Sequence, residues 1–176
     1  MPHQLNWQEI CQMIPKRKAD AQKGDFGRLL CITGSRNMPG ACLLSTQAAL
    51  RGGAGLVTVA TAPENPMRLA AAAPEAMWLP LETDEAGFLR SSDQNRKTLE
   101  KQLSRANAVL LGCGLGVTEE TRRLVHWVLE QAVCPVVLDA DGLNCAVSCI
   151  ELSRRTGKDW ILTPHPGEMA RLTGHS

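Results

Sequence analysis

The stretch Ala108-Val109-Leu110-Leu111-Gly112-Cys113-Gly114-Leu115-Gly116 decides the fold class of this chain. An unbroken run of four apolar residues is typical of a strand that is covered on both faces, as in a parallel sheet. A glycine-rich turn follows this strand, and a helical pattern over 118–132 follows the turn. Two other apolar runs, 28–33 and 159–163, also end in turns that precede helical patterns. This repeated order predicts a doubly wound α/β domain with right-handed crossovers.

The same alternation continues over the rest of the chain. A short helix capped by Asn6 and ended by Pro15 is expected first, followed by a polar entry loop over 16–25. The expected strands are 28–33, 56–60, 76–81, 108–111, 135–139 and 159–163. The expected helices are 40–51, 65–73, 93–106, 118–132, 142–149 and one that starts near 166. Residues 82–92 are expected to form a longer surface loop.

Composition excludes several classes of protein. The 176 residues are 44% hydrophobic and 21% charged, which is usual for one globular domain. A net charge of +1 gives no broad attraction to nucleic acid or to an anionic membrane, and no apolar run is long enough to span a bilayer. The amino terminus lacks the pattern of a secretion signal, and the seven scattered cysteines include no C-x-x-C pair. We therefore expect a cytoplasmic protein without disulfides or a metal site.

The turn with Gly112, Gly114 and Gly116 has two interpretations of equal weight. Its backbone amides can approach an anion, because the following helix presents its positive end there. Alternatively, it is only a tight connection between a strand and a helix. The spacing is one residue short of a dinucleotide fingerprint, although Asp139 ends the next strand much as a ribose-binding acid does. The Rossmann alternative therefore stays open at this point.

The turn after the first strand offers polar donors in Ser35 and Asn37. Gly40 followed by Ala41 allows another backbone to approach the start of a helix. The turn lacks a lysine after its last glycine, so it is not a phosphate-binding P-loop. Lys23, in the loop before this strand, could meet an anion, although an isolated loop lysine is most often just solvated.

His165 lies between Pro164 and Pro166 at the end of the last strand. The two prolines restrict the backbone, which favours a histidine aimed into the crevice at the strand ends. Glu168, one turn later, could face the same crevice or stabilise the helix start by its charge.

Asp139, Asp141 and Asn144 follow another strand. These side chains can organise water or Mg²⁺, or hold a turn through local hydrogen bonds. Because the carboxyl ends of parallel strands share one edge, we expect the turns that follow the strands to meet in one crevice.

Taken together, these segments resemble the ADP/ATP-dependent NAD(P)H-hydrate dehydratases. The resemblance covers about residues 14–172, and its motifs occur in the family's order. They are Lys23-Gly24-Asp25-Phe26-Gly27-Arg28, Gly34-Ser35-x-x-Met38-x-Gly40-Ala41, Gly52-Gly53-Ala54-Gly55-Leu56-Val57-Thr58-Val59, Gly112-x-Gly114-Leu115-Gly116, Asp139-Ala140-Asp141-x-Leu143-Asn144 and Thr163-Pro164-His165-x-Gly167-Glu168. The resemblance implies a ribokinase-like three-layer α/β/α fold with a mostly parallel sheet.

The resemblance also implies an activity and its site. The family removes water from NAD(P)HX, the hydrated form of NADH or NADPH, and uses the terminal phosphate of ADP or ATP, with Mg²⁺, to make the hydroxyl a better leaving group. It implies that Ala41, a glycine of the 112–116 turn and His165 contact the substrate. Lys23, Ser35, Asn37, Asp139, Asn144 and Glu168 are further candidates for lining this site.

The chain departs from the family pattern at three places. Gln22 replaces a histidine, and Cys113 replaces a proline in the glycine-rich turn. The family's Gly-Thr-Gly-Asp turn, which carries the catalytic acid/base, has no counterpart before Ser176. We therefore expect the chain to be incomplete at its carboxyl end and to contain no catalytic residue. The expected division is an amino-terminal helix and entry loop over 1–22 and the dehydratase domain over 23–176.

Two other functions remain open. One is a small-molecule kinase of the ribokinase superfamily, because a fold does not fix its chemistry. The other is a catalytically inactive module for nucleotide binding or assembly. The resemblance implies a homo-oligomer and functional pairing with an NAD(P)HX epimerase domain.

Overall fold

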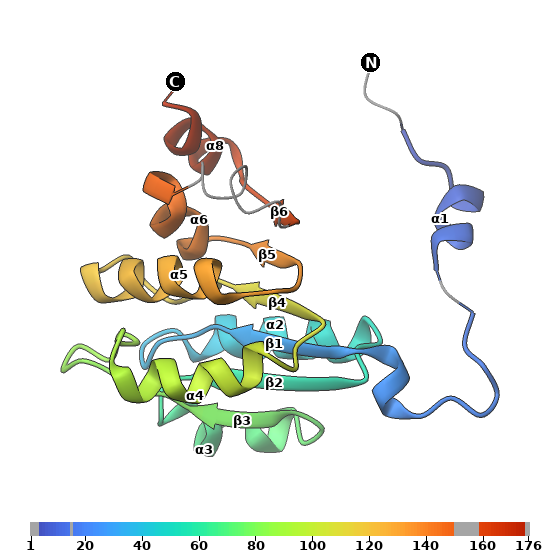
Figure 1. The fold of residues 1–176 in the computed structure, drawn as a ribbon, viewed down its shortest axis with the longest axis horizontal. Helices are drawn as coiled ribbons and strands as arrows, with labels where there is room; N and C mark the ends of the chain where they lie inside the picture. Colours follow the sequence, from blue (N-terminus) through green and yellow to red (C-terminus); the bar gives the residue numbers. More distant parts are fainter. Residues whose placement is uncertain (1–3, 15, 150–158, 175–176) are drawn as a thin grey trace.

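The computed structural model describes residues 4–14, 16–149 and 159–174. Within these ranges six parallel strands form one sheet in the order β3-β2-β1-β4-β5-β6 (Figure 1). The strands are β1 Arg28–Ile32, β2 Leu56–Thr61, β3 Met77–Pro80, β4 Ala108–Leu111, β5 Val136–Leu138 and β6 Trp160–Leu162. The predicted parallel sheet is therefore confirmed, with all six strands at the predicted places.

The strand order reverses between β1 and β4, at the centre of the sheet. The chain first moves outward from β1 to β2 and β3, and then returns to place β4 on the other side of β1. Leu29 pairs with Ala108 across this junction, and Arg28 pairs with Leu56 on the other side. Since every strand runs in the same direction, all six carboxyl ends lie at one edge, which we call the carboxyl edge. Ligands of open α/β sheets bind where such a reversal meets this edge.

Helices cover both faces of the sheet and complete three α/β/α layers. In Figure 1, α4 and α5 lie in front of the sheet, and α2 and α3 lie behind it. The α-helices are α1 Trp7–Met13, α2 Pro39–Arg51, α3 Asn65–Leu69, α4 Asp93–Leu103, α5 Glu119–Gln131, α6 Asp141–Ala146 and α8 Pro166–Thr173. Short 3-10 turns are η1 Lys23–Phe26, η2 Ala70–Ala72 and η3 Val147–Cys149. The first of these turns begins within the expected entry loop over 16–25 and ends one residue beyond it, so the end of that loop forms a 3-10 turn.

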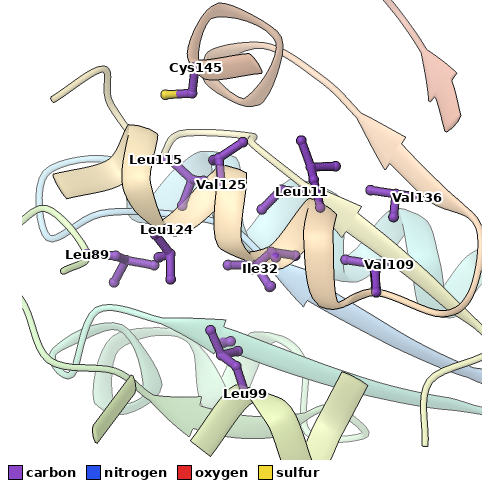
Figure 2. Packing of buried hydrophobic residues seen from close by; sticks show 14 of the residues in the cluster. Ile32, Leu89, Leu99, Val109, Leu111, Leu115, Leu124, Val125, Val136 and Cys145 are labelled. Atoms are coloured by element: carbon purple, nitrogen blue, oxygen red, sulfur yellow. The ribbon is translucent and has the colours of Figure 1, made fainter. Parts of the chain in front are cut away.

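The core divides into two clusters, one on each face of the sheet. On the α4 and α5 face, Ile32 of β1 packs with Leu99 of α4 and Leu124 of α5, all fully buried (Figure 2). On the other face, Cys31 and Val57 pack with Cys42 of α2. Complete burial of one leucine side chain contributes about 1.5–3 kcal/mol, so the larger cluster dominates the hydrophobic stabilisation.

Residues 82–92 form a loop, as expected, but this loop is not confined to the surface. Thr83 and Leu89 form an isolated antiparallel bridge, and the Leu89 side chain is fully buried. Figure 2 shows Leu89 pointing toward Leu124 and Leu115. The loop is therefore fixed over the carboxyl edge by the core itself.

The α1 helix begins at the predicted cap. The Asn6 Oδ1 atom accepts a hydrogen bond from the Glu9 amide at 3.0 Å, and the Glu9 carboxylate accepts one from the Asn6 amide. None of the α1 residues is buried, and Figure 1 shows this helix extending away from the rest of the chain. Its start thus depends on local capping and not on tertiary packing.

Candidate functional site at the carboxyl edge

The turns after β1 and β4 contact each other directly at the strand reversal. The Gly34 amide donates to the Cys113 carbonyl at 2.8 Å. A Cβ atom added to Gly114 would lie 2.7 Å from the Ala41 Cβ and 3.2 Å from the Met38 Cβ. Ala41 and Gly114 therefore lie side by side, as expected. Only a glycine at position 114 allows the two turns to approach this closely.

The other two glycines of the turn are fixed by long-range packing. A Cβ atom on Gly112 would lie 2.0 Å from the Asp139 carbonyl oxygen, and one on Gly116 would lie 2.3 Å from the Phe88 ring. The Gly116 amide donates to the Asp141 carboxylate at 2.8 Å, and the Gly112 amide donates to Ile32. Two of the three glycine amides are therefore already paired within the protein. This pairing favours the tight-turn interpretation for Gly112 and Gly116 and leaves Gly114 facing Ala41.

Asp139 joins the turn after β4 to the turn after β6. Its Oδ1 atom accepts a hydrogen bond from the Thr163 hydroxyl at 2.8 Å, and its Oδ2 atom accepts one from the Cys113 thiol at 3.4 Å. Burial and, after it, the neighbouring Asp139 carboxylate raise the pKa of the Cys113 thiol to about 12. Cys113 therefore stays a protonated donor at neutral pH and does not act as a nucleophile.

The residue after Asp139 has a strained backbone. Ala140 has φ +51° and ψ −120°, and it is the only residue other than glycine with a positive φ in the described ranges. Its carbonyl accepts hydrogen bonds from both the amide and the side chain of Asn144, each at 3.2 Å. Such strain persists only where the surroundings fix the conformation, and it is concentrated at functional sites.

His165 lies at the same edge, where it caps α8. Its Nδ1 atom accepts a hydrogen bond from the Gly167 amide at 3.1 Å, and its Nε2 atom lies 3.3 Å from Glu168 Oε1. The Glu168 side chain is nearly buried and also accepts a hydrogen bond from the His165 amide. Glu168 thus stabilises the helix start, one of its two predicted roles. The His165 side chain is 62% exposed and presents its ring to solvent.

The loop over 82–92 forms a side of the site that the sequence did not identify. The Arg36 amide donates to the Gly87 carbonyl at 2.9 Å, and its guanidinium group pairs with Glu64 at 2.7 Å. The Asn37 side chain donates to the Ala86 carbonyl at 3.4 Å. A loop without regular secondary structure gives no periodic signal from which these contacts could be found.

Two candidates differ from the expected arrangement. Ser35 follows β1 at the carboxyl edge, but its side chain is buried, and its hydroxyl makes no hydrogen bond within the described part of the chain. Lys23 lies in η1, before the amino end of β1, where its carbonyl faces Gly55. The structure therefore brings together the candidates that follow strands and leaves Lys23 at the opposite edge.

The described residues do not form a protein-built metal site. No group of three or more histidine, cysteine, aspartate or glutamate side chains within these ranges could hold a metal ion. The carboxylates of Asp139, Asp141 and Glu168 are already hydrogen-bonded within the protein. Among the described helices, none has both the length and the apolar character needed to cross a bilayer.

Comparisons with known proteins agree with this geometry. The family profile described as NAD(P)H-hydrate dehydratase matches residues 29–176. A bifunctional NAD(P)H-hydrate repair enzyme Nnr of Coxiella burnetii is 40% identical over 172 residues, which cover 98% of this chain and 32% of that protein. An ADP-dependent (S)-NAD(P)H-hydrate dehydratase of Xanthomonas campestris is 38% identical over 163 residues, which cover 93% of this chain and 53% of that protein.

Solved structures share the fold. A ribokinase-like superfamily protein from Enterococcus faecalis matches with a TM-score of 0.79 at 26% identity. The matched region covers 97% of this chain and 56% of that protein. The ADP/ATP-dependent NAD(P)H-hydrate dehydratase from Bacillus subtilis, co-crystallised with ATP/Mg²⁺, matches with a TM-score of 0.70 at 30% identity. The matched region covers 95% of this chain and 54% of that protein. The chain thus spans about a third of the bifunctional relative and about half of the single dehydratases. With its profile match, its sequence relatives and its ribokinase-like fold, the chain belongs to the NAD(P)H-hydrate dehydratase family.

Proposed function

We propose that this chain takes part in the ADP- or ATP-dependent dehydration of NAD(P)HX to NAD(P)H, and that its carboxyl edge binds the hydrated dinucleotide. The observation that carries this proposal is the contact between Ala41 and Gly114 where the strand order reverses, with His165 at the same edge. Family membership supports the choice of substrate. The Xanthomonas relative is named as ADP-dependent and the Bacillus dehydratase as ADP/ATP-dependent, which supports the nucleotide dependence.

The proposed chemistry is an elimination. Transfer of the terminal phosphoryl group to the oxygen of the ring hydroxyl, whose proton passes to solvent water, makes phosphate the leaving group. The C–O bond then breaks and phosphate leaves with its electron pair. A proton passes from the neighbouring ring carbon to water, and the C–H electron pair forms the ring double bond of NAD(P)H. Phosphate and the shortened nucleotide are the other products. Holding the ring and the phosphate donor in one orientation accelerates such a reaction.

His165 is proposed as a contact to the substrate ring and not as a proton carrier. Its Nδ1 atom accepts the Gly167 N–H, so the neutral ring carries its proton on Nε2, which faces Glu168. Both nitrogens are therefore engaged by the histidine's own helix. The exposed face of the ring remains available, and it suits contact with a planar nicotinamide-derived ring.

We assign no catalytic acid or base to the described residues. The Mg²⁺ that the family resemblance implies would neutralise phosphate charge when it is bound. The described side chains alone do not form a set of ligands for it. The proposal therefore gives the described residues the tasks of binding and orienting the substrate.

Titration calorimetry with NADHX and NADH tests the proposal directly. We expect saturable binding of NADHX, and we expect Ala41→Val to weaken it at least tenfold because the added methyl groups narrow the space beside Gly114. Ala71→Val adds the same atoms at an exposed position of η2 and should leave binding unchanged. Absence of NADHX and NADH binding to the folded wild-type chain would contradict the proposal.

The partners and the setting of this activity are also proposals. The bifunctional name of the Coxiella relative supports pairing with a second repair activity, which the resemblance implies to be an NAD(P)HX epimerase. We propose a cytoplasmic homo-oligomer and a domain boundary at 22/23, just before η1. Incubation with sugar alcohols and ATP distinguishes the kinase alternative, since phosphorylated products are expected only if the chain is a kinase.

A further inference from the structure

An open cavity of about 510 Å³ lies beside the candidate site, where α5, α6 and α8 approach the carboxyl edge. Its lining residues are Val117, Arg122, Asn144, Val147 and Arg171. Val117 directly follows the glycine-rich turn, and Arg171 lies on the helix that His165 caps. Residues that line the cavity therefore adjoin elements of the candidate site along the chain. Neither of its two arginines was predicted as a site residue.

Asn144 holds both arginines of this cavity. The Arg171 Nε atom donates to Asn144 Oδ1 at 2.7 Å, and the Arg122 Nη1 atom donates to the Asn144 carbonyl at 3.2 Å. Asn144 is itself fixed, because its amide and its side-chain nitrogen both donate to the Ala140 carbonyl. Two guanidinium groups from separate helices are thus held in place by one residue.

Neither guanidinium group forms an ion pair within the described ranges. Two acids on the same helices or turns are paired with other groups, since Asp141 of α6 accepts the Gly116 amide and Glu168 of α8 pairs with His165. Two positively charged guanidinium groups that are both held by Asn144 repel each other, and an anion bound between them offsets this repulsion. Guanidinium groups present paired N–H donors that match the oxygens of phosphate, and within the described part of the chain each of these two retains unused donors.

We infer that Arg122 and Arg171 form a binding site for a phosphate group, held ready by Asn144. The site is adjacent to the proposed substrate contact, because a Cβ atom on Gly167 would lie 3.9 Å from Arg171 Nη1 and 3.0 Å from His165 Cε1. The identity of the molecule that carries the phosphate rests on the proposed function. Both the dinucleotide and the ADP or ATP contain a diphosphate group, so either could supply it.

Inorganic pyrophosphate tests the site itself by titration calorimetry. We expect Arg122→Gln and Arg171→Gln each to weaken its binding roughly tenfold or more, since each removes charge-assisted hydrogen bonds, and the double variant to lose more. Arg123→Gln makes the same charge change one position away, where the guanidinium group pairs with Glu119 and Glu120, and should bind as the wild type does. Thermal unfolding verifies that each variant is folded. Equal pyrophosphate binding by the wild type and the double variant would overturn the inference.

Parallel titrations with NADH and ADP identify the carrier. A loss of NADH affinity in the double variant, with ADP unaffected, assigns the phosphate to the dinucleotide, and the reverse assigns it to the adenine nucleotide. If wild type binds pyrophosphate but none of NADHX, NADH and ADP, the proposed function fails and the phosphate site stands. If the double variant binds NADH, ADP and pyrophosphate as tightly as wild type, the phosphate site fails and the proposed function stands.

Discussion

Gly114 lies against Ala41 so closely that a Cβ atom on Gly114 would come within 2.7 Å of the Ala41 Cβ. Its φ of +69° also disfavours any other residue. Gly114→Ala should therefore lower the free energy of unfolding by about 2 kcal/mol, since overpacking and backbone strain act together. Urea unfolding measures the change.

Gly40→Ala is the matched control for this prediction. Gly40 lies at the start of α2, and no atom lies within 4 Å of an added Cβ. The change should leave stability unaltered or raise it by up to about 1 kcal/mol, because alanine favours the helix. Equal destabilisation by both substitutions would show that Gly114 is not constrained by Ala41.

Leu89 provides a second test, on the loop that covers the carboxyl edge. Its side chain is fully buried with Leu124 and Leu115, so Leu89→Ala should cost about 2–5 kcal/mol of folding free energy (Figure 2). Leu44→Ala, on an exposed position of α2, should change it by less than about 0.5 kcal/mol. Chemical unfolding of both variants compares the two costs, and a neutral Leu89→Ala would mean that the loop is not fixed by the core.

The fold was predictable because its signals are local. The apolar run at 108–111 forms β4 over the same four residues, and the parallel sheet follows from similar runs separated by helices. The position of Ala41 beside Gly114 followed from topology, since parallel strands bring distant turns to one edge. Asn6 was recognisable as a cap because its partner, Glu9, is only three residues away.

The remaining parts of the site depend on long-range contacts that leave no local pattern. Phe88 faces Gly116 across 28 positions of sequence, and Arg122 reaches Asn144 from another helix. Two prolines suggested that His165 points into a crevice, but hydrogen bonds within its own helix orient the ring. Proline restricts backbone angles and does not determine a side-chain rotamer.

Ala140 allows a test of strain at the site. Its φ of +51° is costly for any residue with a Cβ atom, so Ala140→Gly should raise the free energy of unfolding by about 1 kcal/mol. Ala48→Gly, at an exposed position inside α2, should instead lower it by about 1 kcal/mol. Thermal or urea unfolding distinguishes the two signs, and destabilisation by both would argue against strain at Ala140.

Stability should fall at alkaline pH because of buried thiols. Burial raises the pKa of Cys31 to about 12 from an ordinary value of 9.0. The contribution of this thiol to the free energy of unfolding is therefore fully present below pH 9. It is lost as the pH rises toward 12. Between these two pKa values the folded state keeps a proton that the unfolded state releases. The free energy of unfolding therefore falls by about 1.4 kcal/mol per pH unit. Cys31→Ala should reduce this slope relative to wild type in urea unfolding between pH 9 and 10.5. Identical slopes would contradict the assignment to Cys31.

The two roles of His165 can be separated by two substitutions. His165→Ala removes both the acceptor that caps α8 and the exposed ring, so we expect a loss of about 1 kcal/mol of stability together with weaker binding of NADHX. His165→Asn restores an acceptor for the Gly167 amide without restoring the ring. Stability should therefore return to near the wild-type value, while binding of NADHX stays weak. Thermal unfolding and calorimetry measure the two quantities separately. Full recovery of binding in His165→Asn would show that His165 acts only through the helix cap, and the ring contact to the substrate would have to be abandoned.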